Sequence, residues 1–492
     1  MTAPRLSNLV AAAGLLAYTA ALRESANRKE RNSTLTSGRT HFVGIGGVGM
    51  SGLASILLAQ GEAVSGSDMR DSPVLAQLRQ AGAIVSVGHS ASNVTGARRV
   101  VYTTAIPSSN PEIQAATEAG LPLLHRAEML EEITAPYNSV GVTGTHGKTT
   151  TSALLALMFQ KAGLDPTVLV GGTVEQLGGN ARLGKGNYAV YEACESDNSF
   201  FRLFPTSIIV TNIDSDHLDN HLSVDNLTWS LRQFVESARS EGTVLLCADC
   251  PHTARLGRML DRPFLTFGSS PHAFYRAEAE GIEQGRWWFR AYRGETVLGR
   301  AGMLVPGRHN AVNASAAAGM ALEYGVPWAV AREALESFAG VKRRFEVLGE
   351  KNGVLVMDDY AHHPTEIAAV LCAVREAWQR RIVVVFQPHL YSRTVLLQQE
   401  FGVCFRDAHE LVVTDVYPAR EQPIPGVDGS VITEAVKRHS PDGANVHYVA
   451  DKAAVLPYLR GRLRPGDMLL TMGAGDVRTV AEDFLADSSA GK

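Results

Sequence analysis

Two glycine-rich turns constrain the fold of this chain more than any other feature. The first is Gly44-Ile45-Gly46-Gly47-Val48-Gly49, and the second is Gly144-Thr145-His146-Gly147-Lys148-Thr149-Thr150. Each turn follows a short apolar segment typical of a buried strand and precedes a helix-like segment. A strand that leads through a tight turn into a helix is the unit from which parallel sheets are built. We therefore expect an α/β protein with mostly parallel sheets covered by helices.

The same alternation of strands and helices continues along the chain and falls into three blocks. A length of 492 residues also suggests about three domains. We expect an N-terminal extension at 1–38, a Rossmann-like domain at 39–136, a central P-loop-type domain at 137–341 and a C-terminal Rossmann-like domain at 342–492. The central block includes an antiparallel hairpin around Arg286–Gly294. The C-terminal block has five strand-like segments, at Val354–Asp358, Ile382–Phe386, Leu411–Val416, Val446–Val449 and Met468–Met472.

Composition excludes several classes of protein. The formal net charge is −4, so no basic excess points to a nucleic acid partner, and any phosphate-bearing ligand must be held by local basic groups and backbone amides. Five scattered cysteines favour a reducing compartment and a cytoplasmic location. Cys247 and Cys250 form a single C-x-x-C without a second ligand pair, so we interpret them as plain thiols.

The apolar run Leu9–Leu22 has fourteen residues, whereas a membrane span needs about 20. We interpret this run as a short helix, expect no membrane span, and expect a chain that starts near Ser37 to remain active. Sequence gives no oligomeric signal, and we expect a monomer or a weak homodimer.

The first glycine turn has the surroundings of a dinucleotide-binding site. A strand precedes Gly44, a helix follows Gly49, and Asp68 lies about twenty residues further on at the end of the next strand. Gly44, Gly46, Gly47 and Gly49 would let a pyrophosphate approach the backbone at a helix N-terminus. The pattern does not distinguish NAD from another pyrophosphate, such as a UDP-sugar.

The second turn is similar to a P-loop, although two residues separate its glycines where a P-loop has four. Its backbone amides would hold phosphates, Lys148 would reach the β- and γ-phosphates, and the Thr149 hydroxyl would bind Mg²⁺. Further oxygen ligands are expected where neighbouring strands end. The candidates are Glu192 and the run Asn212-Ile213-Asp214-Ser215-Asp216-His217-Leu218-Asp219.

Four later motifs carry polar residues of the same kind. Asn310 and Asn313 are three residues apart, so one helix face can present both. The pair Arg343-Arg344 suits closure onto a phosphate, although a solvated arginine pair is an equally good interpretation from the residues alone. The runs Asp358–Glu366 and Gln387–Thr394 follow predicted strands, and the spacing of their histidines does not fit zinc.

Together these motifs resemble the Mur ligase family over about residues 41–477. The shortened phosphate loop, the Gly44–Ala54 segment, and the segments Asp358–Glu366, His389–Thr394 and Asp415–Glu421 carry the resemblance. It implies a first domain that binds a UDP-sugar, a central domain that binds ATP, and a C-terminal domain that helps to bind the incoming amino acid. Residues 1–38 have no counterpart in the family pattern, and Cys194 stands where that pattern has aspartate.

The resemblance also implies roles for single residues. ATP would be bound by Gly144, Thr145, His146, Gly147, Lys148, Thr149, Thr150, Asn310, Asn313 and Arg344. The UDP-sugar would be bound by Gly44, Gly46, Gly47, Gly49, Asp68 and His217. Thr149, Glu192 and His217 would bind Mg²⁺, His389 and Arg393 would contact the substrates, and Lys148, Arg344 and His362 would be catalytic. Since neither Lys148 nor Glu192 is expected in an apolar core, we expect Lys148→Ala and Glu192→Ala to fold.

The motifs favour the family members that use ATP to join L-alanine to UDP-N-acetylmuramic acid during peptidoglycan synthesis, through an acyl phosphate. Three alternatives stay open. One is a family member that adds a whole peptide to the same nucleotide sugar. Another is a nicotinamide oxidoreductase, which would leave the phosphate loop unexplained. The last is a non-catalytic regulator, against which the intact Lys148 and Glu192 argue.

Overall fold

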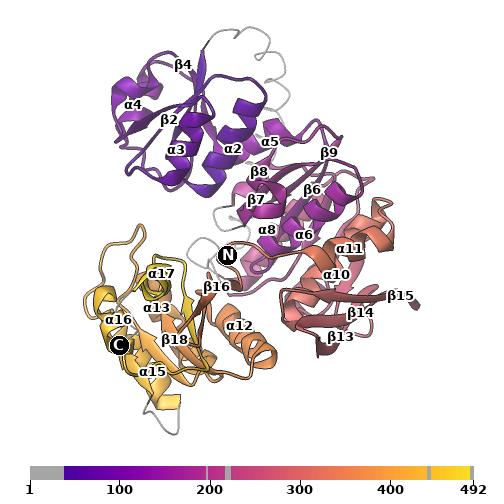
Figure 1. The fold of residues 1–492 in the computed structure, drawn as a ribbon. Coiled ribbons are helices and arrows are strands. Elements are labelled where there is room, and N and C mark those ends of the chain that lie inside the picture. The colour runs from indigo at the N-terminus through magenta and orange to yellow at the C-terminus, as the bar shows by residue number, and fades with distance from the viewer. Residues whose placement is uncertain (1–37, 196–197, 216–222, 440–444, 488–492) are drawn as a thin grey trace, which may run out of the picture.

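The chain folds into three α/β domains, each built on its own sheet (Figure 1). The computed structural model describes residues 38–195, 198–215, 223–439 and 445–487. Almost all of the expected N-terminal extension, including Leu9–Leu22, and the expected ligand His217 lie outside the described residues. None of the helices in the described part of the chain has the length and apolar character needed to cross a membrane.

The first domain has five parallel strands in the order β3-β2-β1-β4-β5. The order turns back between β1 and β4, and in such sheets ligands bind beyond the carboxyl ends of the strands at this point. The first glycine turn follows β1 there. The elements are β1 Arg39–Val43, α2 Val48–Ala59, β2 Val64–Asp68, α3 Pro73–Gln80, β3 Ile84–Val87, β4 Ala97–Tyr102, α4 Pro111–Glu118, β5 Leu123–His125 and α5 Arg126–Thr134.

The middle domain has a ten-stranded mixed sheet in the order β15-β14-β13-β12-β11-β10-β6-β9-β7-β8. Strands β6, β7 and β9 to β13 run parallel to one another, whereas β8, β14 and β15 are antiparallel to their neighbours. The strands are β6 Asn138–Thr143, β7 Thr167–Val174, β8 Gly179–Arg182, β9 Tyr188–Glu192, β10 Ser207–Val210, β11 Val244–Cys247, β12 Leu265–Gly268, β13 Tyr275–Glu283, β14 Arg286–Arg293 and β15 Thr296–Met303.

The helices of the middle domain explain why its phosphate loop has a fixed position. The helices are α6 Lys148–Lys161, α8 Val224–Glu236, α9 Pro251–Met259, α10 Arg308–Glu323 and α11 Trp328–Ser337. Helix α6 is buried from Thr149 to Phe159 because α10 and α11 cover the side that the sheet leaves open. A helix that is apolar on every side belongs in a core, so the residues that begin α6 have little freedom to move.

The C-terminal domain has six strands in the order β16-β17-β21-β18-β19-β20, and only the edge strand β16 is antiparallel. Its strands are β16 Glu346–Lys351, β17 Val354–Asp359, β18 Arg381–Phe386, β19 Glu410–Val413, β20 Val446–Tyr448 and β21 Asp467–Met472. Its helices are α12 Pro364–Ala377, α13 Tyr391–Leu396, α14 Gln398–Cys404, α15 Ser430–His439, α16 Lys452–Leu459 and α17 Arg478–Ala486.

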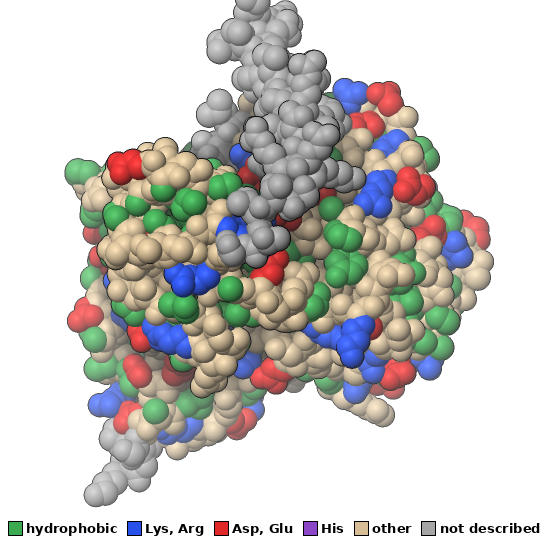
Figure 2. Space-filling view, turned by 90° about the horizontal axis from the view of Figure 1, so that it is seen from above, with side chains coloured by type: hydrophobic (Ala, Val, Ile, Leu, Met, Phe, Trp, Pro, Cys, Tyr) green, Lys and Arg blue, Asp and Glu red, His purple; other side chains and the backbone are tan. Residues whose placement is uncertain are grey.

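The domains contact one another along defined elements. Helix α2 packs against β7 and β8, and Asn180 Nδ2 donates to Val48 O over 2.8 Å. Lys342 N donates to Thr173 O over 2.9 Å where the chain passes into the C-terminal domain. On the face seen in Figure 2, described acidic and basic side chains are interspersed, as the small net charge suggests.

Candidate functional site

The second glycine turn is a tight loop between β6 and α6 that leaves no room for a side chain at Gly144 or Gly147. Gly144 has φ +118° and Gly147 has φ +82°, which L side chains rarely adopt. A Cβ on Gly144 would lie 2.3 Å from Thr211 Oγ1, and a Cβ on Gly147 would lie 2.5 Å from Asn313 Oδ1. The loop can therefore present its backbone closely to a ligand, as phosphate binding requires.

Lys148 extends across this loop and faces a buried carboxylate. Its Nζ donates to Gly144 O at 2.5 Å, to Thr145 O at 2.9 Å and to Glu195 Oε1 at 3.0 Å. The side chain of Glu195 is 0% exposed and that of Lys148 is 14% exposed. Burial works against the charged amine, but the nearby Glu195 carboxylate outweighs it and raises the pKa of Lys148. The loop thus carries a fixed positive charge at the helix N-terminus.

Glu192 and Thr149 lie on either side of two glycines of β7 and offer oxygen ligands suited to a hard cation. Gly171 N donates to Glu192 Oε1, and a Cβ on Gly171 would lie 2.8 Å from both Glu192 carboxylate oxygens. A Cβ on Gly172 would lie 3.4 Å from Thr149 Cγ2. Only glycine allows β7 to approach both groups so closely. A carboxylate and a hydroxyl beside the phosphate loop fit Mg²⁺ as the resemblance implies.

Asn310 and Asn313 lie on the helix that faces the loop, as their spacing predicts. Asn313 Nδ2 donates to Asn310 Oδ1 over 3.4 Å, and Asn310 Nδ2 donates to Pro306 O over 2.7 Å. Both line a cavity of about 430 Å³ between the middle and C-terminal domains, which Gly147 and Arg344 also line. This volume lies within the range of small-molecule sites.

Two further groups on the wall of this cavity were not predicted. His309 lines it, and burial, helped by the nearby Arg344, lowers the pKa of His309 to about 4. Asp359 accepts hydrogen bonds from Phe345 N at 2.8 Å and Ala361 N at 2.7 Å. Burial raises the pKa of Asp359 to about 6, against the opposing effect of Arg344. A neutral imidazole, a carboxyl and a guanidinium therefore share one wall.

The C-terminal domain brings the predicted substrate residues together. The rings of His362 and His389 have centroids 5.7 Å apart, and Arg393 Nη1 lies 3.3 Å from His389 Nδ1. His389 stacks on Tyr417 at 5.9 Å and an interplanar angle of 14°. Leu390, with φ +71°, is the N-cap residue of α13, the helix that carries Arg393. Residues from two separate loops thus form one polar group.

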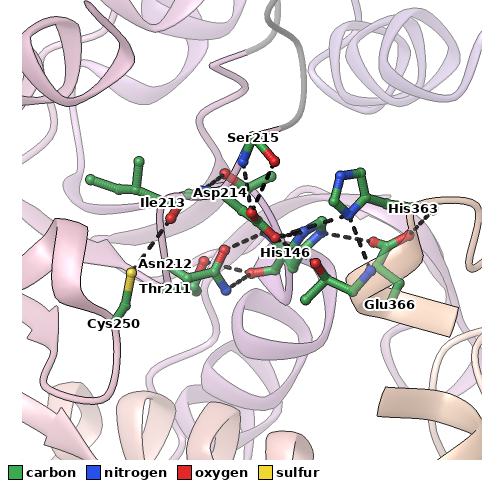
Figure 3. Close-up of polar contacts among 12 residues, drawn as sticks. His146, Thr211, Asn212, Ile213, Asp214, Ser215, Cys250, His363 and Glu366 are labelled. Carbon is green, nitrogen blue, oxygen red and sulfur yellow. Dashed lines mark hydrogen bonds and ion pairs between the residues drawn. The ribbon is translucent and has the colours of Figure 1, made fainter. Parts of the chain in front are cut away.

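A hydrogen-bonded network joins the phosphate loop to the C-terminal domain (Figure 3). His146 Nε2 lies 3.1 Å from Asp214 Oδ2, and His146 Nδ1 lies 3.1 Å from Glu366 Oε1 on α12. Thr365 Oγ1 donates to Asp214 Oδ2 over 2.7 Å. Burial opposes protonation, but the two carboxylates outweigh it and raise the pKa of His146 to about 9. His146 is therefore an imidazolium between two carboxylates at neutral pH.

The first glycine turn lies beside a second cavity. Gly44 has φ +79°, and Gly46 N donates to Asp68 Oδ2 over 2.9 Å, so Asp68 fixes the turn itself. Gly46 and Val48 line a cavity of about 720 Å³. Gly172 and Asn180 of the middle domain also line it, as does Lys342, where the chain passes into the C-terminal domain. Gly44, Gly47, Gly49 and Asp68 do not line this cavity.

Some groups in these networks were missed from the sequence. Glu195 and Glu366 stood in motifs that were recognised, but no role was assigned to them, and Asp214 was considered only as part of a run of possible Mg²⁺ ligands, whereas it contacts His146 and Thr365. The signal that could have found them is their position just after a strand or at the start of a helix beside the phosphate loop. The five cysteines are free thiols, as interpreted from their spacing.

The fold and the site define a three-domain α/β protein with a nucleotide-type phosphate loop in its middle domain. Three family models match the chain. They are the "Mur ligase family, catalytic domain" at residues 39–138, the "Mur ligase middle domain" at 142–321 and the "Mur ligase, glutamate ligase domain" at 343–475. The chain belongs to the Mur ligase family, whose members are ATP-dependent, amide-forming ligases.

Among named relatives, the chain is 45% identical to the UDP-N-acetylmuramate–L-alanine ligase of Anaeromyxobacter dehalogenans over 448 residues, 91% of this chain and 97% of that protein. It is 42% identical to the enzyme of the same name from Geotalea uraniireducens over 447 residues, again 91% and 97%. The crystal structure of the Thermotoga maritima UDP-N-acetylmuramate-alanine ligase superposes with a TM-score of 0.79 at 30% identity, covering 92% of this chain and 100% of that one. A murein peptide ligase from Psychrobacter arcticus, with TM-score 0.69 and 24% identity over 91% and 98%, shares the fold.

Proposed function

We propose that this protein uses ATP to join L-alanine to UDP-N-acetylmuramic acid, giving ADP and phosphate, in peptidoglycan precursor synthesis. Relatives of that name, 45% and 42% identical over 91% of the chain, support this substrate choice. The observation that carries the proposal is that the two cavities adjoin at one wall. Gly172 lines the cavity of the first glycine turn, and its missing Cβ would lie 2.6 Å from Val341, which lines the cavity of the phosphate loop.

The reaction needs ATP because a carboxylate does not react with an amine at neutral pH. The lactyl carboxylate attacks the γ-phosphorus, the bond to the β–γ bridging oxygen breaks, and ADP leaves. The neutral amine of L-alanine then attacks the carbonyl carbon of the acyl phosphate. The tetrahedral intermediate collapses to the amide and inorganic phosphate, and the amine gives up its proton.

The roles proposed for the middle domain follow from its charges and donors. Lys148 and the amides of the loop from Gly144 to Thr150 hold the ATP phosphates, and Asn310 and Asn313 hold the base side of the nucleotide. Arg344, on the cavity wall, offsets the charge of the transferring phosphoryl group. Thr149, Glu192 and His217 bind Mg²⁺, which neutralises phosphate charge when it is bound. His217 rests on sequence alone.

The other two domains supply the acceptor and the amino acid. Gly44, Gly46, Gly47, Gly49 and Asp68 form the turn that holds the UDP-sugar. His389 and Arg393 contact the amino acid or the acyl group, because a buried guanidinium beside an imidazole suits a carboxylate. His362, with its ring near His389, accepts the amine proton as the general base. Closure of the domains keeps water from the acyl phosphate.

A phosphate-release assay tests the proposal. We expect release to require UDP-N-acetylmuramic acid, ATP, Mg²⁺ and L-alanine together, and removal of Mg²⁺ by EDTA to abolish it. A mass spectrum should show the alanyl product. Robust turnover with a tripeptide and little with L-alanine would reassign the chain to peptide addition.

Its quaternary state and location are part of the same proposal. We propose a monomer or a weak homodimer that acts in the cytoplasm, where ATP and UDP-sugars are made. Sedimentation velocity over a range of concentrations should show a monomer at low micromolar protein, and a stable higher oligomer would contradict this.

A further inference from the structure

We propose that His146 and Glu366 form a positioning pair that holds the C-terminal domain against the phosphate loop and fixes His362 in the substrate site. The pair spans two domains, since His146 belongs to the loop between β6 and α6 and Glu366 to the first turn of α12. Its significance for catalysis rests on the proposed function, whereas its effect on domain closure does not.

The main-chain atoms of His146 are fixed within the middle domain. Thr211 Oγ1 donates to His146 O over 2.6 Å, Asn212 Nδ2 donates to the same oxygen over 3.0 Å, and His146 N donates to Asn212 Oδ1 over 2.9 Å. The ring then lies between Asp214 and Glu366, with one nitrogen directed to each (Figure 3). The loop thus presents an imidazole in one orientation toward α12.

The two carboxylate oxygens of Glu366 bind groups of different domains. Oε1 accepts from the ring of His146 at 3.1 Å. Oε2 accepts from His362 N at 3.2 Å and lies 3.4 Å from His362 Nδ1. It also accepts from His363 N at 3.4 Å, which completes the capping box of α12. One rigid carboxylate therefore connects the ATP-side loop to the histidine that faces His389.

A metal ion at the same place is the competing interpretation. His146, Asp214 and His363 have ligand atoms within 4.8 Å of one another. However, both ring nitrogens of His146 are directed at carboxylates, and His363 Nδ1 accepts from Thr365 N at 3.3 Å as the helix cap. Hydrogen bonds already engage both ring nitrogens of His146 and the Nδ1 of His363, so we infer a domain-bridging ion pair.

Two substitutions of the same residue separate the two ring contacts. In His146→Asn the side-chain amide nitrogen takes approximately the place of Nδ1 and keeps a donor toward Glu366. In His146→Gln the amide nitrogen takes approximately the place of Nε2 and keeps only the contact to Asp214. We expect kcat/KM for L-alanine to fall about 10- to 100-fold in His146→Gln, as for a small misplacement of a reacting group. The loss in His146→Asn should be smaller, because its amide keeps a donor toward Glu366. Arg375 lies on the same helix as Glu366, and Arg375→Gln, which removes its ion pair with Asp407, is the control and should match the wild type.

Three further measurements complete the test. The double variant His146→Gln/Glu366→Gln should lose little more activity than either single variant, because both break one contact. Small-angle X-ray scattering of the ligand-free protein should show a larger radius of gyration for His146→Gln than for the wild type and His146→Asn. Metal analysis of the wild type should find no stoichiometric transition metal.

The outcomes are separable. The proposed pair would be contradicted if the losses of activity in the double variant were additive, or if the Asn and Gln variants lost equal activity. An unchanged radius of gyration, or a bound metal that His146→Gln releases, would also contradict it. If the wild type itself shows no alanine-dependent phosphate release, the proposed function fails, and the scattering comparison still decides whether His146 and Glu366 close the domains.

Discussion

At the scale of single residues, Lys148 is tied to stability as well as to the phosphates. Glu195 is fully buried, and Lys148 lies 3.0 Å from it with a side chain only 14% exposed. Removing one member of a buried pair destabilises by about 3–5 kcal/mol, and the partial exposure of Lys148 favours the lower end, about 3 kcal/mol. We therefore expect Lys148→Ala to abolish turnover and also to lower the free energy of unfolding in urea. Lys148→Ala is still expected to fold, but the buried Glu195 carboxylate makes the variant less stable than the wild type.

The double variant Lys148→Ala/Glu195→Gln is the matched control. Because it removes both charges, it should recover most of the lost stability while turnover stays absent. The affinity for UDP-N-acetylmuramic acid, measured by calorimetry, should remain near that of the wild type in both variants, since that ligand is assigned to the first domain. A Lys148→Ala protein as stable as the wild type would contradict the buried pair.

The local motifs were predictable at this scale, but their partners were not. The spacing of Asn310 and Asn313 predicted that both lie on one helix face, as they do. Gly44, Gly144 and Gly147 have the positive φ that only glycine adopts easily. Glu195 pairs with a residue 47 positions away. Whether Glu195 or Glu192 pairs with Lys148 depends on how the chain bends after β9, and short-range sequence patterns do not encode that bend.

At the scale of helices and strands, the buried parallel strands were predictable because they are continuous apolar runs. The five strands expected in the C-terminal block are present with small shifts. The edge strand β16 was missed because Glu346–Lys351 is half polar. Strand β7 was missed because Gly171 and Gly172 interrupt its apolar run. Strand β8 was missed because its segment, Gly179–Arg182, is polar. Tertiary pairing, not local pattern, stabilises such strands.

Helix α12 should connect pH to domain closure through His146. The His146 ring faces Asp214 and Glu366, and its centroid lies 5.0 Å from that of the His363 ring. The pKa of His146 is raised to about 9 in the folded protein, so its stabilising contribution is complete below the unfolded value of about 6.5 and is lost as pH rises through 9. The difference in melting temperature between the wild type and His146→Gln should therefore shrink between pH 6.5 and 9. A difference that stays constant over this range would contradict an imidazolium at this position.

At the scale of the whole molecule, the two cavities adjoin where Gly172 packs against Val341. The larger lies between the first and middle domains, and the smaller lies between the middle and C-terminal domains. Sequence predicted each ligand-binding turn within its own domain. The sequence could not predict that β7 places Gly172 between the two cavities, since that position depends on how α2 and the C-terminal domain pack against the middle sheet.

Gly172→Ala tests this meeting point. Gly172 does not have a positive φ, so alanine fits the backbone, but its methyl group would lie 2.6 Å from Val341 Cγ1 and 3.4 Å from Thr149 Cγ2. It would therefore push against Val341 and Thr149, between the proposed sites of the sugar nucleotide and of the ATP phosphates. A displacement of about 1 Å between reacting groups lowers rates by about 100-fold. We expect kcat to fall by one to two orders of magnitude, while calorimetry gives Kd values for UDP-N-acetylmuramic acid and ATP within about threefold of the wild type. If ATP or the sugar nucleotide no longer bound, Gly172 would belong to one binding site, whereas unchanged kcat would show that the substrates meet elsewhere.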